Sequence, residues 1–277
     1  MFAGLHRFYF QEVFDMNAPE ELIHYYNTHD EGARLESRHG KIEWLTTIRY
    51  IEKYSKPGMK ILEIGAGTGK YSHFFAQKGY HVDAVELIEH NIEIFKQLTK
   101  ENEPVTITQG NALDLSLIDH NIYDITLLLG PMYHLYTTKN QLQALSEAIR
   151  VTKKGGIIFA AYCNSDMTMY QCFLKKEMLY RQIAADKIDL ETFELFSEPE
   201  DVFQLYRKKD VDTLMSHFRV TRLHYVGTDM LSRLIKKTIN EMDKETYALY
   251  LRYHFSICER EDMIGATNHM LDIFRKE

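Results

Sequence analysis

The stretch MKILEIGAGTGK, residues 59–70, decides the fold of this 277-residue chain. Ile61, Leu62 and Ile64 form a short apolar run that ends in three alternate glycines, which is typical of a buried parallel strand breaking into a tight turn. Aromatic residues at helical spacing follow in 71–78, and a glycine then ends that pattern as a helix C-cap does. The stretch therefore predicts a strand, a glycine turn and a helix in direct succession.

Such a turn predicts a cofactor site. Glycine leaves the backbone bare, so that a ligand can touch it. The ligand then lies at the carboxyl end of the strand and faces the exposed N–H groups of the helix. A dinucleotide-binding turn has a glycine where this chain has Lys70, which argues against a dehydrogenase.

The sequence EIGAGTG at 63–69 resembles the first motif of class I S-adenosylmethionine-dependent methyltransferases, and the resemblance extends over roughly residues 40–165. It implies a methyltransferase enzyme with S-adenosyl-L-methionine as its cofactor. It also implies that this cofactor contacts Glu63, Gly65, Ala66, Gly67 and Gly69.

A short strand predicted at 82–85 ends at Glu86, whose carboxylate can accept two hydrogen bonds side by side. The family places an acid at this point to hold both ribose hydroxyls of the cofactor. The resemblance therefore assigns Glu86, and Leu87 after it, to cofactor binding.

A β-branched, alternating run at 105–109 predicts the next strand. Just beyond it, Asn111 and Ala112 fall where the family contacts the adenine amino group and a ring nitrogen. Asn111 departs from the commoner aspartate, although its amide oxygen can still accept a hydrogen bond. Asp114 remains the alternative for the adenine contact.

The succession of strands and helices predicts a doubly wound, seven-stranded, mostly parallel sheet with right-handed crossovers, the Rossmann-like methyltransferase fold, with helical lid insertions. The predicted strands are 61–64, 82–85, 105–109, 123–129, 157–163, 220–227 and, antiparallel by the family's topology, 264–274. We divide the chain into an N-terminal helical lid segment at 1–40, a cofactor-binding core at 41–164, a helical insert at 165–209, and the remainder of the sheet at 210–277. That last part carries a second helical insert at about 229–262.

The predicted fourth strand ends at GPMYHL, residues 130–135, where this fold opens between donor and acceptor. The resemblance places the main chain near Leu129 beside the methionine amino group. His134 is the candidate general base, because its ordinary pKa lies near working pH, and Tyr133 is its candidate neighbour. A purely structural role for His134 stays open.

Family members often fold the region before the first strand over the methionine end of the cofactor. By that resemblance, Tyr26 and Arg38 are candidates to close on the cofactor, with Arg38 as a partner of its carboxylate. The alternative is that both are ordinary surface or packing residues.

Composition narrows the class of protein. The net charge of −7 and the pI of about 6.0 disfavour nucleic acid as the main partner. The three cysteines lack the spacing of a metal site, so we expect no metal and a reducing, cytoplasmic setting. We find no apolar run of about 20 residues, and hence expect no membrane span. Residues 1–15 could be a dispensable extension.

The acceptor is expected to be a small, partly hydrophobic molecule, because both inserts are rich in Met and aromatic residues. Those side chains could instead pack the inserts onto the core or bury a homodimer face. Two rivals to the enzyme remain: a non-catalytic sensor of the cofactor, and an RNA methyltransferase, which the acidic balance opposes. The acceptor atom is not apparent from the sequence.

Overall fold

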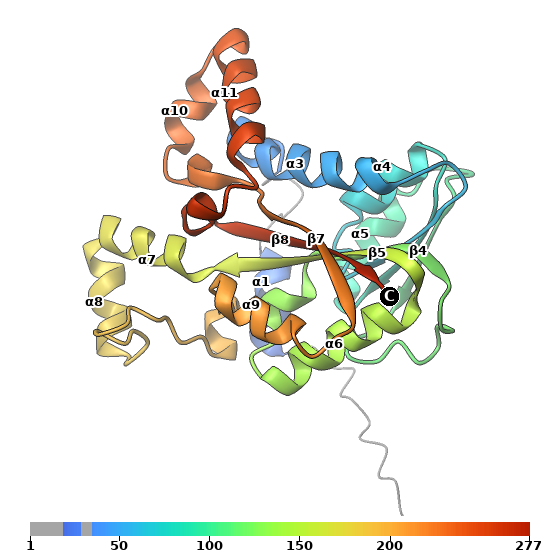
Figure 1. Cartoon of the computed structure of the whole chain (residues 1–277), viewed down its shortest axis with the longest axis horizontal. Helices are drawn as coiled ribbons and strands as arrows, with labels where there is room; N and C mark the ends of the chain where they lie inside the picture. The colour runs from blue at the N-terminus through green and yellow to red at the C-terminus, as the bar shows by residue number, and fades with distance from the viewer. Residues whose placement is uncertain (1–18, 29–34) are drawn as a thin grey trace, which may run out of the picture.

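A computed structural model describes residues 19–28 and 35–277 (Figure 1). The predictions made for residues 1–15, and the part of the 1–40 segment that falls on 1–18 and 29–34, lie outside the described residues. Within the described chain, one eight-stranded sheet runs through the molecule. Seven strands follow the order β3-β2-β1-β4-β5-β8-β7, and β6 pairs with β5.

The strand order confirms the predicted doubly wound sheet. Strands β1 to β3 are added toward one edge of the sheet, and the chain then returns to add β4 on the other side of β1. β8 is antiparallel to both of its neighbours, and the other pairs are parallel. The strands are β1 (Lys60–Ile64), β2 (His81–Glu86), β3 (Val105–Gln109), β4 (Tyr123–Leu128), β5 (Thr152–Asn164), β6 (Leu205–Tyr206), β7 (Val220–Gly227) and β8 (His269–Lys276).

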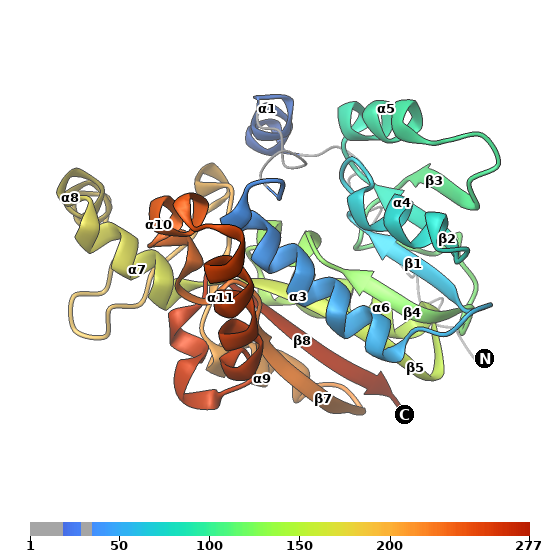
Figure 2. The ribbon, with the colours of Figure 1, turned by 90° about the horizontal axis from the view of Figure 1, so that it is seen from above.

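Helices cover both faces of the sheet, as Figures 1 and 2 show. The α-helices are α1 (Glu20–Thr28), α3 (Arg38–Tyr54), α4 (Lys70–Gln77), α5 (Glu89–Leu98), α6 (Thr138–Val151), α7 (Ser165–Leu174), α8 (Lys176–Ala184), α9 (Lys208–Met215), α10 (Lys236–Glu241) and α11 (Lys244–Ile257). Short 3₁₀ turns are η1 (Pro131–His134), η2 (Pro199–Asp201), η3 (Met230–Arg233) and η4 (Glu261–Ala266). None of the helices in the described parts is both long and apolar enough to cross a bilayer.

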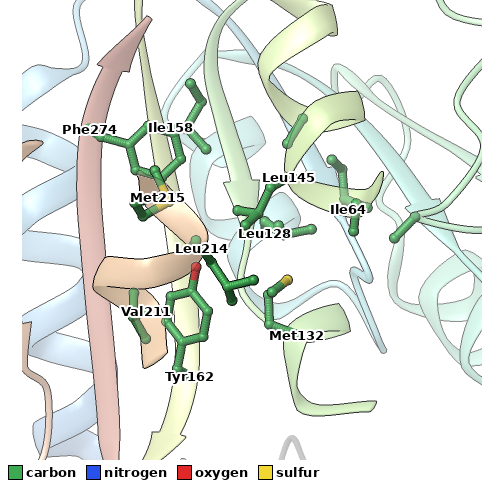
Figure 3. Close-up of a cluster of buried hydrophobic side chains, with 14 of the residues drawn as sticks. Ile64, Leu128, Met132, Leu145, Ile158, Tyr162, Val211, Leu214, Met215 and Phe274 are labelled. Atoms are coloured by element: carbon green, nitrogen blue, oxygen red, sulfur yellow. The ribbon is translucent and has the colours of Figure 1, made fainter. Parts of the chain in front are cut away.

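The core is divided by the sheet because successive strand residues point to opposite faces. Ile61 packs with α3 and α4 on one face, whereas Leu62 packs with α6 and α9 on the other. Figure 3 shows part of the second cluster, where Leu145 of α6 and Leu214 of α9 meet the side chains of β4 and β5. The central strands are therefore mostly apolar on both faces, which explains their hydrophobic runs in the sequence.

The expectation of no strand between 165 and 209 was wrong. The two residues of β6 pair with Cys163 and Asn164 at the end of β5. The Tyr206 hydroxyl group donates a hydrogen bond to the carbonyl of Met132 at 2.8 Å, which anchors the strand. Two residues are too few to produce an alternating pattern, so the sequence carries no signal for this strand.

Two strand boundaries also differ from the predictions. The last strand begins at His269, because residues 261–266, predicted in part as strand, form η4. β5 begins at Thr152, five residues before the predicted start of this strand at 157, and Gly155 within it has a φ of 79°. In both places the element was predicted and its boundary was misplaced.

Candidate functional site

The glycine turn lies at the carboxyl end of β1, as predicted. The backbone N–H groups of Gly65 and Ala66 donate to the carbonyl of Val85 at 2.8 and 3.1 Å, so the turn is tied to the end of β2. The N–H group of Gly67 donates to Oε2 of Glu86 at 2.7 Å. The turn and the acid predicted to grip the cofactor are therefore in direct contact.

The three glycines serve different purposes. A Cβ at Gly65 would lie 2.6 Å from the Pro131 ring, and one at Gly69 would lie 2.4 Å from the Phe95 ring. A Cβ at Gly67 would meet nothing within 4 Å. Gly69 therefore permits helix packing and lines none of the cavities described below, whereas Gly67 leaves bare backbone beside open space.

Cavity A, about 460 Å³, lies beyond the ends of β2 and β3. Its walls include most of the residues predicted for the nucleoside: Gly65, Gly67, Glu86, Leu87, Asn111 and Ala112. The rival adenine partner, Asp114, is not in these walls. Its carboxylate accepts a hydrogen bond from the backbone N–H of Ser116 at 2.9 Å. The geometry thus favours Asn111 and Ala112.

Glu86 is 5% exposed, and burial raises the pKa of its carboxyl group, while hydrogen bonds from Ile88, Gly67 and Asn91 oppose that rise. The N–H of Ile88 donates to Oε1 at 2.8 Å. The carboxylate still lines cavity A, so its remaining lone pairs face the space where a sugar would lie.

Cavity B, about 200 Å³, lies beyond the ends of β1 and β4. It is lined by the remaining predicted residues Tyr26, Glu63, Ala66, Leu129 and Tyr133, together with others including Glu43, Arg233 and His269. Cavities A and B share Tyr26, Gly65, Gly67 and Gly130. They are therefore two ends of one elongated site.

Glu63 is fully enclosed. Burial raises the pKa of its carboxyl group to about 8, against the effect of its hydrogen bonds with Ser72. The Ser72 hydroxyl contacts Oε2 directly. A mostly protonated carboxyl group at neutral pH therefore stands where the resemblance expects the amino-acid end of the cofactor.

His134 lines cavity A and not cavity B. Its Nε2 lies 2.9 Å from the Tyr26 hydroxyl, and its Nδ1 lies 2.7 Å from the carbonyl of Val202. With a proton on Nδ1, the ring donates to Val202 and accepts from Tyr26. Both nitrogens are thus engaged in bridging α1 to the chain before β6, which favours the structural role that the sequence left open.

Arg38 is not brought to the site. It is the first residue of α3, whose N-cap is Ser37, and its side chain leaves on the side of α10 and α11. Its guanidinium group donates to the carbonyl of Asn240 at 3.4 Å and lies 5.8 Å from the centre of the Tyr247 ring. Arg38 lines neither cavity A nor cavity B. The predicted contact with the cofactor carboxylate has no geometric support here.

A buried group that the sequence analysis missed faces cavity B. Nδ1 of His269 lies 2.9 Å from Oδ2 of Asp229 and 3.3 Å from Oε2 of Glu43. Burial would lower the pKa of His269, but the charges of Glu43 and Asp229 raise it well above its ordinary value. Burial would likewise raise the pKa of Asp229, but His269 holds it at about 2.

No metal was predicted. In the described residues, the same three side chains place possible ligand atoms within 4.8 Å of one another. The shared Nδ1 proton accounts for these short distances without an ion. The other oxygen of Asp229, Oδ1, accepts hydrogen bonds from Thr267, Asn268 and His269, which fixes the carboxylate in place. We therefore describe the group as a hydrogen-bonded acid–base cluster.

Cavity C, about 590 Å³, lies between α7, α8 and the ends of β5 and β8. It shares Phe203, Arg233 and His269 with cavity B. Its walls combine apolar residues (Cys163, Cys172, Met178, Leu195, Phe196, Phe203 and Leu205) with a few polar groups. The three cavities therefore form a continuous series from the end of β3 to the α7–α8 insert.

An elongated site beyond the switch point of a doubly wound sheet, with a glycine turn and a strand-end acid, defines a nucleoside-cofactor protein of the Rossmann-like class. Residues 62–160 match the family model of the methyltransferase domain. A demethylmenaquinone methyltransferase from Renibacterium salmoninarum is 29% identical over 105 residues, which cover 38% of this chain and 41% of the relative.

A ubiquinone biosynthesis O-methyltransferase from Rickettsia felis is 24% identical over 186 residues, which cover 60% of this chain and 76% of the relative. The solved structure of a SAM-dependent methyltransferase from Thermotoga maritima, described as a possible histamine N-methyltransferase, matches the fold with a TM-score of 0.54 and 16% identity. That match covers 93% of this chain and 98% of the other. The match over residues 62–160 and the fold shared with the solved structure agree with the resemblance to class I S-adenosylmethionine-dependent methyltransferases.

Proposed function

We propose that this protein transfers a methyl group from S-adenosylmethionine to a small acceptor that occupies cavity C. The observation that carries the proposal is the continuity of the cavities. Cavities A and B share the bare backbone of Gly65 and Gly67, and cavities B and C share Phe203 and His269. One end of the series has nucleoside-binding features, and the other has room for a second molecule.

The residues present fit the cofactor. Glu86 is a buried carboxylate at the wall of cavity A, suited to ribose hydroxyls, and Asn111 and Ala112 are suited to adenine. The open space beside Gly67 is where a Cβ would otherwise intrude. Glu63, in cavity B, is placed for the amino-acid end.

When bound, the sulfonium of the cofactor supplies an activated methyl group and a good leaving group. The protein then has to align the acceptor with that methyl and keep water away. The rings of His269 and Phe203 line both cavity B and cavity C, and the Tyr133 ring in the wall of cavity B lies 6.0 Å from that of His269. They are suited to positioning an acceptor and excluding water.

The sensor alternative requires a lid filled by its own side chains. Cavity C, at about 590 Å³, lies within the size range of small-molecule sites and speaks against that alternative. The net charge of −7 continues to disfavour an RNA acceptor.

The first test is binding, measured by titration calorimetry with S-adenosylhomocysteine, the demethylated product. We expect Glu86→Gln to weaken binding by about 10- to 100-fold, because a charge-assisted hydrogen bond is worth roughly 1.5–3 kcal/mol. The matched control is Glu93→Gln, on the exposed side of α5, which should bind as the wild type does. Circular dichroism would confirm that both variants are folded.

Failure of the wild-type protein to bind S-adenosylhomocysteine would refute the proposal. If binding holds, transfer of a labelled methyl group to a panel of phenols, amines, thiols and carboxylic acids distinguishes enzyme from sensor. A sensor would bind the nucleoside and methylate nothing.

A further inference from the structure

Hydrogen-bond donors line cavity C where it meets cavity B. Arg233 and His269 line both cavities, and Asn268 precedes His269 in the wall of cavity C. Within the described chain, the guanidinium groups of Arg233 and Arg181 have no hydrogen bond or ion pair. Both arginines are exposed, so their donors are open to water or to a ligand.

Asn268 supplies a second, independent observation. The residue is 6% exposed, and its Nδ2 is buried without a hydrogen-bond partner. Its Oδ1 is already held by Nε2 of Gln171 at 2.7 Å, which fixes the direction of the amide. A buried, unpaired donor costs free energy unless something accepts from it.

The acids in the same walls do not cancel these cations. Lys187 pairs with Asp201 at 2.6 Å, so these two charges neutralise each other. Two guanidinium groups, of Arg181 and Arg233, then face the single remaining carboxylate of Glu200. The walls of cavity C therefore carry more positive than negative charge, together with apolar side chains.

His269, which lines both cavity B and cavity C, adds a further positive charge. Glu43 of α3 and Asp229 after β7 both contact its Nδ1, which keeps the ring protonated. The Cys163 side chain forms a further hydrogen bond with His269, the Tyr133 ring lies 6.0 Å away, and Arg233 lines the same two cavities. With Nδ1 engaged by carboxylates, Nε2–H is the donor that a ligand would share with the Cys163 sulfur.

We propose that the methyl acceptor is an amphipathic anion. Its carboxylate or phosphate lies on Arg233 and His269, and its apolar body lies in cavity C. Guanidinium and imidazolium N–H groups both donate, so their common complement is an acceptor-only group such as a carboxylate or phosphate. This inference rests on the proposed function and specifies its substrate class.

One rival must be separated by experiment. Arg233 also lines cavity B, so its guanidinium could instead serve the carboxylate of the cofactor. S-adenosylhomocysteine carries that carboxylate, whereas 5′-methylthioadenosine lacks the amino-acid chain. Comparison of the two ligands therefore reports which partner Arg233 has.

The experiment uses the full chain saturated with S-adenosylhomocysteine and four probes of equal length: octanoate, octyl phosphate, 1-octanol and octylamine. Binding is followed by calorimetry and by ligand-detected NMR. We expect at least one anion to bind about tenfold more tightly than octanol, with octylamine weakest. The relative affinities of octanoate and octyl phosphate tell a carboxylate acceptor from a phosphate acceptor.

In Arg233→Gln the preference for the anion over octanol should fall about tenfold, while the Kd values for S-adenosylhomocysteine and 5′-methylthioadenosine stay unchanged. Arg219→Gln, at an exposed position before β7 outside the three cavities, is the matched control and should keep the preference.

Two results would overturn the inference. One is octanol or octylamine binding as well as both anions, or neither anion binding at millimolar concentration. The other is Arg233→Gln weakening S-adenosylhomocysteine but not 5′-methylthioadenosine, which would assign Arg233 to the cofactor. Either result leaves the proposed function intact, since that depends on S-adenosylhomocysteine binding to the wild-type protein.

Discussion

At the residue scale, burial sets the ionisation of Glu63 in the wall of cavity B. Its carboxyl group has a pKa of about 8 because burial penalises the ionised form. At pH 7 it is mostly protonated in the folded protein, whereas the unfolded chain loses this proton near pH 4.5. The contribution of Glu63 to the free energy of unfolding of the ligand-free protein should therefore fall as the pH rises from about 4.5 to 8.

Binding of S-adenosylhomocysteine should reverse that penalty. Its ammonium group, placed near Glu63, favours the ionised carboxylate, so binding should release up to about one proton near pH 7. Affinity should accordingly increase between about pH 6 and 8. Calorimetry in phosphate and Tris, buffers with different ionisation enthalpies, measures the proton count.

Two controls isolate the effect of Glu63. The variant Glu63→Gln, and the ligand 5′-methylthioadenosine, which has no ammonium group, should each remove the buffer dependence. Proton uptake by the wild-type protein, or an unaltered proton count in Glu63→Gln, would contradict the assignment.

The sequence predicted residues that the fold brings together around cavity A, but it did not predict the acid–base cluster at cavity B. The glycine turn, Glu86 and Asn111 lie within short segments whose spacing is itself the signal. Glu43, Asp229 and His269 come from α3, the loop after β7 and β8. Only the folded sheet brings them together, and no local spacing indicates it.

At the element scale, α1 is held over the site by a few contacts. The Tyr26 hydroxyl meets His134, and the ring of Tyr25 lies 5.2 Å from that of Phe203. α1 has one buried residue, Leu22, so little apolar burial secures it. Such an element can open and close at low cost.

Removal of the hydroxyl group in Tyr26→Phe should weaken S-adenosylhomocysteine about fivefold, the value of one hydrogen bond of about 1 kcal/mol. Hydrogen exchange of α1 should accelerate, while the melting temperature should change little. His134→Ala should resemble Tyr26→Phe in both measurements if the ring bridges elements. A loss of methyl transfer with unaltered nucleoside binding would instead restore His134 as a general base.

The strands with a long apolar or alternating pattern were predicted from the sequence. A strand that forms only because a neighbouring strand offers an edge was not predicted. β4 and β7 were placed from their apolar or alternating runs, to within one residue. β6 consists of two residues that become a strand only because the end of β5 offers an edge. The start of β8 is set by η4, whose buried Ile264 continues an apolar pattern without being part of the strand.

At the scale of the whole molecule, the sheet makes one folding unit of segments that lie far apart in the chain. β8, the last strand, inserts between β5 and β7 and pairs with both. Residues 62–160, which match the methyltransferase domain, do not include β8. On their own they would leave the edge of β5 that pairs with β8 without a partner. We infer that the chain unfolds in a single cooperative transition.

Arg222 tests this cooperativity at a place remote from the cavities, near the start of β7. Its Nε and Nη2 donate to both oxygens of Asp272 on β8, at 2.7 and 2.8 Å, and its Nη1 donates to Asp212 of α9. Asp272 is fully buried, and burial raises the pKa of its carboxyl group even though Arg222 opposes that rise.

Arg222→Met leaves this carboxyl group buried without a cation, which should cost about 3–5 kcal/mol. By calorimetry at pH 7 the melting temperature should fall roughly 6–15 °C in one transition, with S-adenosylhomocysteine still bound at low temperature. The double variant Arg222→Met/Asp272→Asn should recover much of the loss because no buried charge remains, and Arg219→Met, at an exposed site, should change little. Two separate transitions, of which Arg222→Met shifts only one, would show instead that the β7–β8 part and the cofactor-binding part fold independently.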